Sequence, residues 1–151
     1  MALKQQIEQD IKTAMLAGDK TLVTTLRGLK SVILYAEVAK SSREQGLGDA
    51  EIIELFSKEA KKRQESAELY SKGGRQDQAE AEVVEKQVIE RYLPQQLTED
   101  QLQTVVDEAI EEIDASGLAQ MGQVIAAVRS KTAGAADGAQ ITQLVKARLQ
   151  P

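Results

Sequence analysis

The chain has 151 residues, of which 42% are hydrophobic and 28% are charged, a balance typical of a folded globular protein. It contains neither cysteine nor histidine, which excludes disulfides, thiolate nucleophiles, Ser-His-Asp catalysis and zinc sites built from the usual nitrogen and sulfur ligands. The net charge of −5 gives no overall basic surface, so any phosphate contacts must come from a local cluster.

Helical periodicity begins at the start of the chain. Because only 3% of the residues are aromatic, the core must be aliphatic, which favours packed helices over a β-sandwich. A first helix is predicted to end at Gly18, and Asp19 is expected to cap a second helix by accepting a hydrogen bond from a free backbone N–H. After a polar loop over residues 41–48, Asp49 is predicted to cap a third helix. The predicted apolar stripe of the second helix is Leu22, Leu26, Leu29, Ile33 and Ala36.

The third helix places an arginine on its apolar face. That face is predicted to hold Ile52, Ile53, Phe56, Ala60, Ala67 and Tyr70, with Arg63 among them. A buried guanidinium must be paired and hydrogen-bonded, so we expect Arg63 to meet Asp77 or Glu85 of the neighbouring helix as a structural ion pair. The lysines of the opposite face, Lys58, Lys61 and Lys62, could follow an RNA backbone, but intervening glutamates favour a solvated surface.

Two glycines separate the third helix from a fourth. Gly73 is expected to be its left-handed C-cap, and the fourth helix is predicted from about Gln76 to Leu93, since Pro94 cannot continue it. Its predicted stripe is Ala81, Val84, Val88 and Tyr92. A connection of two or three residues forces the helices to run antiparallel, so residues 1–94 are predicted to form an up-and-down bundle of about four helices.

Residues 95–151 are predicted to form a smaller three-helix domain, which makes the whole chain all-α. Thr98 and Gln101 have the spacing of a capping box, and Asp137-Gly138 is expected to start the last helix. The predicted stripes are Leu102, Val105, Ala109 and Ile113, then Met121, Val124, Ile125 and Val128, then Ile141, Leu144, Val145 and Leu149. Charge differs between the parts: residues 1–95 carry 15 basic and 16 acidic side chains, and residues 96–151 carry 4 and 8.

No motif of a catalytic, metal or cofactor site is recognisable. Gly46-Leu47-Gly48 lacks a third glycine at dinucleotide spacing and a preceding strand. The carboxylates of Glu108, Glu111 and Glu112 fit a solvated helix face better than a magnesium site. There is no run of 18 apolar residues, and Met1 leads straight into an amphipathic pattern. We therefore expect a cytoplasmic protein with no catalytic residues, no metal, no cofactor and no membrane contact.

Seven short motifs occur in an order and spacing that together are specific. They are Leu26-Arg27, Ala36-Glu37, Glu59-x-x-Lys62-Arg63-x-x-Ser66, Gly74-Arg75-x-Asp77, Tyr92-Leu93-Pro94-x-Gln96-Leu97, Met121-Gly122-Gln123-Val124 and Gly134-x-Ala136-Asp137-Gly138. In these the chain resembles the GatB/YqeY family over nearly its whole length. Its members are small stand-alone relatives of the tail of the B subunit of transfer-RNA-dependent amidotransferase, a carbon–nitrogen ligase with glutamine as amide donor.

The resemblance implies an all-helical accessory module without an active site of its own. In the full amidotransferase the tail contacts transfer RNA (tRNA), and the catalytic cradle lies in a domain absent here. The candidate phosphate contacts of this chain are Arg75, Arg129, Lys131, Lys146 and Arg148. Family members commonly carry Lys or Arg where this chain has Ala133, Ala135 and Ala139. If those charges are the RNA contacts of the family, RNA binding is expected to be weaker here or to use another site.

A second interpretation is a protein–protein adaptor that docks on an amidotransferase subunit or another translation protein. The acidic balance of residues 96–151 favours it, because such a surface repels phosphate and suits a basic protein. Neither interpretation includes DNA or a membrane as a partner.

Overall fold

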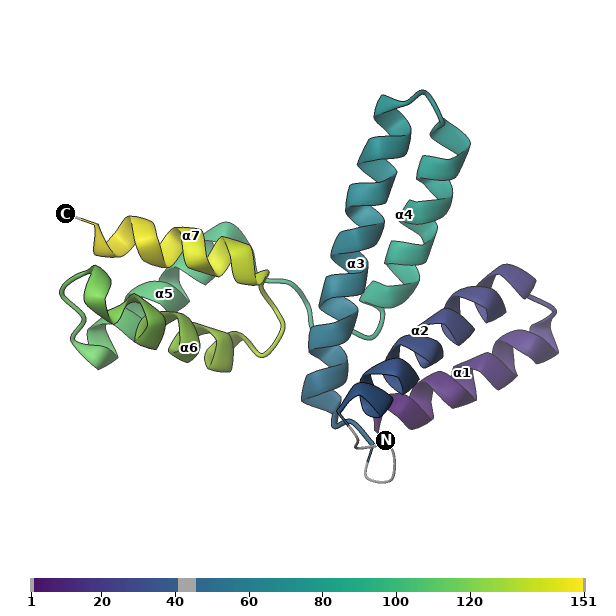
Figure 1. The fold of residues 1–151 in the computed structure, drawn as a ribbon, viewed down its shortest axis with the longest axis horizontal. Helices are drawn as coiled ribbons and strands as arrows, with labels where there is room; N and C mark the ends of the chain where they lie inside the picture. Colours follow the sequence, from purple (N-terminus) through teal and green to yellow (C-terminus); the bar gives the residue numbers. More distant parts are fainter. Residues whose placement is uncertain (1, 41–45, 151) are drawn as a thin grey trace. The chain divides into compact units, whose positions relative to one another are not determined.

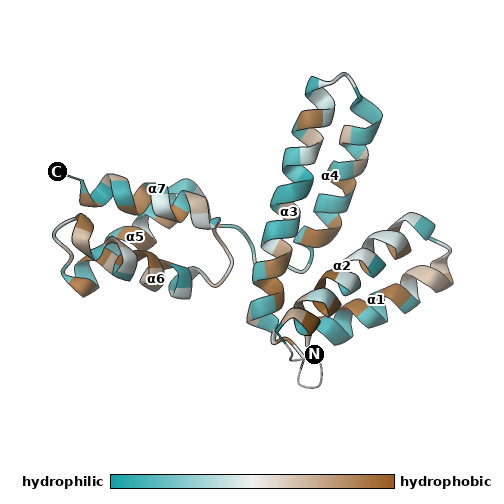
Figure 2. Ribbon diagram, in the orientation of Figure 1, coloured by the Kyte–Doolittle hydropathy of each residue, from teal (hydrophilic) through white to brown (hydrophobic). Residues whose placement is uncertain are grey.

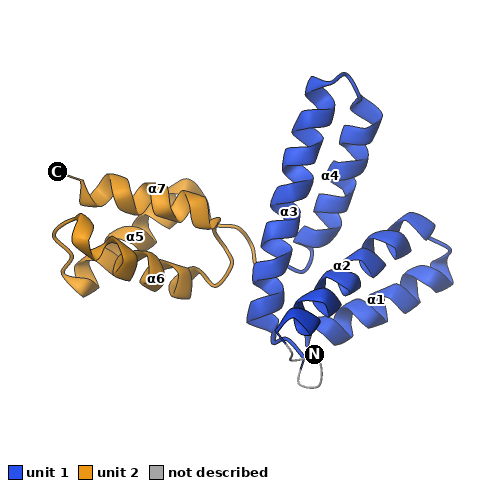
Figure 3. Ribbon diagram, in the orientation of Figure 1, with its two compact units in different colours: residues 1–93 blue, residues 94–151 orange. Residues whose placement is uncertain are grey.

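The computed structural model describes residues 2–40 and 46–150 and divides the chain into two compact units, residues 1–93 and 94–151 (Figure 3). Every regular element in the described ranges is helical, which confirms the predicted all-α fold. Unit 1 holds α1 (Leu3–Ala17), α2 (Lys20–Ala39), α3 (Asp49–Lys72) and α4 (Gln76–Glu90). Unit 2 holds α5 (Glu99–Ile113), the 3₁₀ turn η1 (Leu118–Gln120), α6 (Met121–Thr132) and α7 (Gly138–Leu149). None of the described helices is long and apolar enough to cross a membrane.

Unit 1 consists of two antiparallel hairpins, α1–α2 and α3–α4 (Figure 1). Each helix carries both hydrophobic and hydrophilic residues along its length, as expected of helices that bury one face (Figure 2). α2 contacts both helices of the second hairpin, and α1 contacts α3. The shared core consists of Ile7, Ile11, Ala14, Val23, Leu26, Leu29, Ile33, Ile52, Phe56, Ala60, Val88 and Ile89.

Two aromatic side chains connect α3 to the segment after α4. The rings of Phe56 and Tyr92 pack edge to face with centroids 6.0 Å apart. The Tyr92 hydroxyl donates a hydrogen bond to Oδ2 of Asp10 on α1. Burial, and then the hydrogen bond to Asp10, raise the pKa of Tyr92 above its ordinary value of 10.0.

This shift predicts a loss of stability in alkali. Because the folded chain holds the Tyr92 proton more tightly than the unfolded chain, the contribution is fully present below pH 10.0 and is lost as the pH rises above that value. We expect the free energy of unfolding to fall more steeply above that pH in the wild type than in Tyr92→Phe. Urea unfolding at a series of pH values, followed by far-UV circular dichroism, measures this. If the free energy of unfolding fell equally steeply with pH in the two proteins, Tyr92 would not contribute to the loss of stability in alkali.

Two predicted helix ends are shifted by one residue. Gly48 is the N-cap of α3, and Asp49 is its first helical residue, whose carboxylate accepts a hydrogen bond from the N–H of Leu3 at 3.0 Å. At the other end of α3 the left-handed residue is Gly74, with φ +75°, and not Gly73. The reason is that the Gly73 N–H still donates to a carbonyl four residues back, which extends the helical pattern by one residue.

Two other predicted caps are confirmed. Oδ1 of Asp19 accepts a hydrogen bond from the N–H of Leu22 at 3.1 Å. Thr98 and Gln101 form the reciprocal hydrogen bonds of a capping box at the start of α5. Each cap satisfies backbone N–H groups that the first helical turn leaves without a partner.

The predicted apolar stripe of α4 is rotated in the structure. The buried residues are Ala79, Val88 and Ile89, whereas Ala81 and Val84 are exposed. α4 packs mainly on α3, whose inward-facing Arg63 requires acidic partners. The inner side of α4 is therefore partly polar, which a search for apolar periodicity cannot detect.

Unit 2 is a three-helix unit in which α5, α6 and α7 all contact one another. Its core consists of Leu102, Val106, Ala109, Val124, Val128, Ile141, Val145 and Leu149. The segment before α5 is attached to the turn between α6 and α7. The Leu97 N–H donates to the carbonyl oxygen of Ala135 at 2.8 Å, and the Gln96 amide donates to that of Gly134 at 3.1 Å. These bonds fix the turn that leads into α7.

Candidate nucleic-acid interface

Charge in unit 2 is segregated by helix. Residues 94–117 carry seven acidic and no basic side chains, whereas residues 118–151 carry four basic side chains and one acidic side chain. The four basic residues are Arg129 and Lys131 in the last turn of α6, and Lys146 and Arg148 in the last turn of α7. There they complement the partial negative charge of each helix C-terminus. The acidity of unit 2 therefore belongs to α5 and its flanking residues, and not to the α6–α7 pair.

Two of the four cations are paired with α5. Nζ of Lys131 lies 2.8 Å from Oε1 of Glu112, and this hydrogen bond raises the pKa of Lys131. The guanidinium of Arg148 holds Asp107 through both carboxylate oxygens, with Nε 3.2 Å from Oδ1 and Nη2 3.3 Å from Oδ2. The side chains of these two pairs are between 34% and 62% exposed, so a competing anion can reach them.

Arg129 and Lys146 have no carboxylate within ion-pair distance in the described part of the chain. The Arg129 guanidinium lies over the start of α7: its Nη2 is 2.9 Å from the position that a Cβ would occupy at Gly138. The N-cap of α7 is Asp137, whose side chain makes no capping hydrogen bond. Free N–H groups at a helix N-terminus and a nearby guanidinium are both suited to a phosphate oxygen.

The five candidate phosphate contacts do not converge on one pocket. By helical rise, Lys146 lies about 12 Å along α7 from Gly138. Lys131 and Arg148 point toward different parts of α5. Arg75 belongs to unit 1, where it is the N-cap of α4 and lines a shallow pocket of about 400 Å³ at the turn of the α3–α4 hairpin. The arrangement is a distributed basic surface on α6 and α7.

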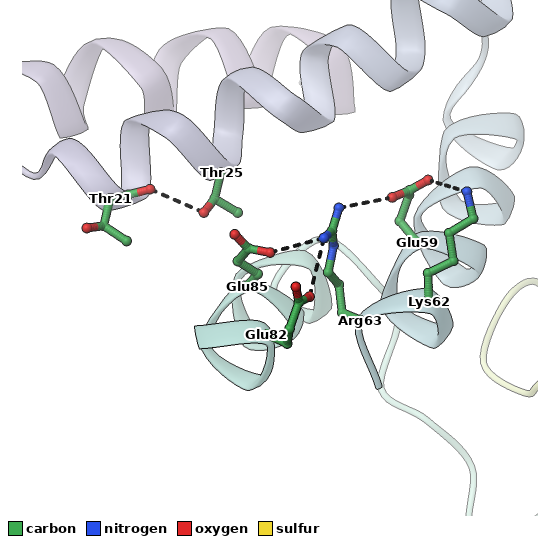
Figure 4. Close-up of polar contacts among 7 residues, drawn as sticks. All are labelled: Thr21, Thr25, Glu59, Lys62, Arg63, Glu82 and Glu85. Carbon is green, nitrogen blue, oxygen red and sulfur yellow. Dashed lines mark hydrogen bonds and ion pairs between the residues drawn. The ribbon is translucent and has the colours of Figure 1, made fainter. Parts of the chain in front are cut away.

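Arg63 is the centre of an ion-pair cluster in unit 1 (Figure 4). Its Nη1 lies 3.3 Å from Oε2 of both Glu82 and Glu85 on α4, and its Nη2 lies 3.8 Å from Oε2 of Glu59. Of the two partners predicted from sequence, the structure pairs Arg63 with Glu85, and Glu82 takes the place of Asp77. In a hairpin that turns at residues 73–74, position 63 lies opposite 85, whereas Asp77 lies nearer the turn.

We interpret this ion-pair cluster as a structural contact between helices. Three carboxylates surround one guanidinium, and Lys62 adds a second cation 3.3 Å from Glu59. Within residues 2–40 and 46–150 no group of three or more carboxylates is arranged to hold a metal ion. The cluster joins α3 to α4 by charge.

Replacing Arg63 by alanine should therefore destabilise unit 1 by about 1 kcal/mol at low salt, a value reduced because the side chain is partly exposed. The loss of stability should be smaller in high salt, because salt screens the repulsion among the remaining carboxylates. Urea unfolding at low and high salt measures both effects. Lys62→Ala is the matched control and should cost less than about 0.5 kcal/mol. A loss of stability that is the same at low and high salt would argue against repulsion among the carboxylates as its cause.

Glu37 is a buried carboxylate that the sequence prediction missed. Its side chain is only 1% exposed, and both its oxygens lie 3.0 Å from Nζ of Lys4. Oε2 also accepts the N–H of Leu47 at 3.0 Å, close to Gly46, whose φ is +74°. Glu37 follows Ile33 by four residues, so helical spacing alone places it on the buried stripe of α2 in place of Ala36. The carboxylate ties α1 and α2 to the start of α3.

Comparison with known proteins identifies one family and one relative. A model of the family described as Yqey-like protein matches residues 4–149, almost the whole chain. The protein named "Altered inheritance of mitochondria protein 41, mitochondrial" from Eremothecium gossypii is 31% identical over 87 residues. The aligned part covers 58% of this chain and 46% of that relative, so the match spans less than half of the relative's length.

Proposed function

We propose, because this chain belongs to the Yqey-like protein family, that it is an accessory module that binds tRNA through the ends of α6 and α7 and has no active site of its own. Its context is the tRNA-dependent amidotransferase reaction, in which a carbon–nitrogen ligase uses glutamine as amide donor. The chain takes part by holding the RNA, and we place it in the cytoplasm.

The segregation of charge in unit 2 carries this proposal. All four basic residues of the unit lie on α6 and α7, and Arg129 lies beside the uncapped start of α7. The pairs that hold Lys131 and Arg148 are exposed, and water and salt screen the attraction within exposed ion pairs. A phosphate can therefore replace Glu112 or Asp107 at small cost.

The test is a fluorescence-anisotropy titration of labelled total tRNA with the full chain at low and high salt, with duplex RNA as competitor. We expect a dissociation constant in the micromolar range or below that rises with salt, and binding that the duplex does not displace. Absence of binding at low salt, where phosphate contacts are strongest, would overturn the proposal.

Charge reversal should locate the contacts. The variant Arg129→Glu/Lys131→Glu loses two phosphate contacts. The negative slope of the logarithm of the association constant against log salt concentration should therefore become shallower by about 1.4–1.8. The matched control is Lys58→Glu/Lys62→Glu, which changes the net charge equally on α3. We expect this control to bind almost like the wild type. Equal weakening in both variants would mean that net charge, and not this surface, determines binding.

A protein adaptor is the second candidate function, favoured by the seven acidic residues between positions 94 and 117. Such a surface suits a basic region of an amidotransferase subunit or of another translation protein. In this case the chain would bind purified amidotransferase without RNA, and Glu108→Lys/Glu111→Lys would weaken the complex. Retained binding in that variant would exclude α5 as the contact surface.

A further inference from the structure

The exposed side of α2 is basic and apolar and carries no acidic side chain. Glu37, the one carboxylate within α2, is buried and held by Lys4. Residues at helical spacing along the outside of the helix define what we call the α2 outer face; they are Lys20, Thr24, Arg27, Ser31, Leu34, Tyr35 and Val38, and all are exposed. Its N-terminal half is basic and polar, and its C-terminal half is apolar.

The basic half has charge available for a partner. Neither Lys20 nor Arg27 has a carboxylate within ion-pair distance among the described residues. The Arg27 guanidinium instead lies 3.7 Å from Sδ of Met15, which is itself exposed on α1. The nearby Asp19 carboxylate is used to cap α2. Guanidinium and ammonium groups without carboxylate partners can pair with an incoming anion without first losing an ion pair.

The apolar half is not part of the core. Tyr35 is 75% exposed, Val38 55% and Leu34 42%, and none of the three is among the buried residues that form the core of unit 1. The outward side of a surface helix is normally polar, and isolated exposed apolar residues are common, but three neighbours on one face form a patch. Such patches in soluble proteins mark contact surfaces.

We propose that the α2 outer face is a docking surface for an acidic amphipathic helix of a partner protein. α2 has 20 residues and is about 30 Å long, so a partner helix of similar length can lie along it. Carboxylates of that helix pair with Lys20 and Arg27, and its apolar side chains pack on Leu34, Tyr35 and Val38. One partner helix can thus pair with the basic residues and also cover the apolar patch.

Other occupants fit less well. Single-stranded RNA stacks its bases on aromatic side chains, and here Tyr35 is accompanied by the aliphatic Leu34 and Val38. A helix that lies in a membrane surface is apolar along its whole length, whereas this face is apolar only in one half. The proposed docking involves unit 1 alone and does not depend on tRNA binding by α6 and α7.

The test uses the full chain with the photo-reactive residue p-benzoylphenylalanine in place of Tyr35, irradiated in its own host cells. The control carries the same residue at Leu69, which is 69% exposed on α3, outside the α2 outer face. We expect a nuclease-resistant protein adduct from position 35 alone. Its cross-linked peptide should be rich in Asp and Glu, with apolar residues three or four positions apart. In the Lys20→Glu/Arg27→Glu background the adduct should decrease by about tenfold.

The contrary outcomes are distinct. A nuclease-sensitive adduct, a lipid adduct, or a peptide from another copy of this chain would show that the face binds nucleic acid, a membrane or a second copy instead of an acidic helix. An adduct unaffected by the charge reversal, an adduct formed equally from position 69, or no adduct would overturn the docking surface itself. Far-UV circular dichroism of each variant establishes that the substitutions, all at exposed positions, leave the fold intact. The charge-reversed variant should bind tRNA like the wild type, so failure of one proposal is distinguishable from failure of the other.

Discussion

Replacing Phe56 by alanine is expected to lower the free energy of unfolding of unit 1 by about 3–5 kcal/mol. Phe56 is completely buried, has the largest side chain among the fully buried residues, and packs edge to face on Tyr92. The loss would be a large part of the total stability of a small domain.

The effect can be measured on unit 1 alone. All three tyrosines, Tyr35, Tyr70 and Tyr92, lie in residues 1–93, so tyrosine fluorescence reports the unfolding of unit 1, whereas far-UV circular dichroism reports both units. Urea unfolding followed by the two signals should separate the units. Phe56→Leu is the control and should cost less than the alanine variant, because it leaves a smaller cavity. A cost below about 1 kcal/mol for Phe56→Ala would contradict the assigned core.

Removing the Glu37 carboxylate should have the second largest effect, about 2–3 kcal/mol for Glu37→Ala. The substitution leaves the N–H of Leu47 without its partner and removes the counter-charge of Lys4. The cost stays below that of a completely buried ion pair, because Lys4 is partly exposed and can turn to water.

A double-mutant cycle separates the two contributions. We expect Lys4→Ala alone to cost less than Glu37→Ala, and the two substitutions together to cost less than the sum of the single effects by about 1 kcal/mol or more. Urea unfolding of the four proteins, followed by tyrosine fluorescence, gives these values. Additive effects would show that Lys4 and Glu37 do not interact energetically, and a small cost for Glu37→Ala would contradict the role of the carboxylate at the start of α3.

Features that depend on local sequence were predictable. The capping box at Thr98, the cap at Asp19 and the all-helical fold follow from side chains within a few residues of one another, so they do not require knowledge of the tertiary structure. The same local rules placed the left-handed C-cap one residue too early, at Gly73. The N–H of Gly73 still donates to the carbonyl of Leu69, and the residue types alone do not show that the helical hydrogen bonds reach this far.

Features that depend on pairing between helices were predicted only in part. Arg63 on an apolar face required an acidic partner, but the choice among Asp77, Glu82 and Glu85 is made by the register of the α3–α4 hairpin. The acidic average of residues 96–151 argued against RNA, whereas seven of the eight acidic residues lie on α5 or beside it and all four basic residues lie on α6 and α7. The pairing of Lys131 and Arg148 with α5 has no local sequence signal.

Contact between RNA and the ends of α6 and α7 is the proposal that matters most for the function of this chain. Its most direct test is nuclear magnetic resonance of the nitrogen-15-labelled full chain, in which backbone amide shifts are followed as unlabelled tRNA is added. We expect shifts concentrated at Arg129, Gly138 and Lys146, small shifts along the exposed side of α5, and reversal of all of them in high salt. Shifts confined to residues 1–93, or no shifts at low salt, would contradict this proposal.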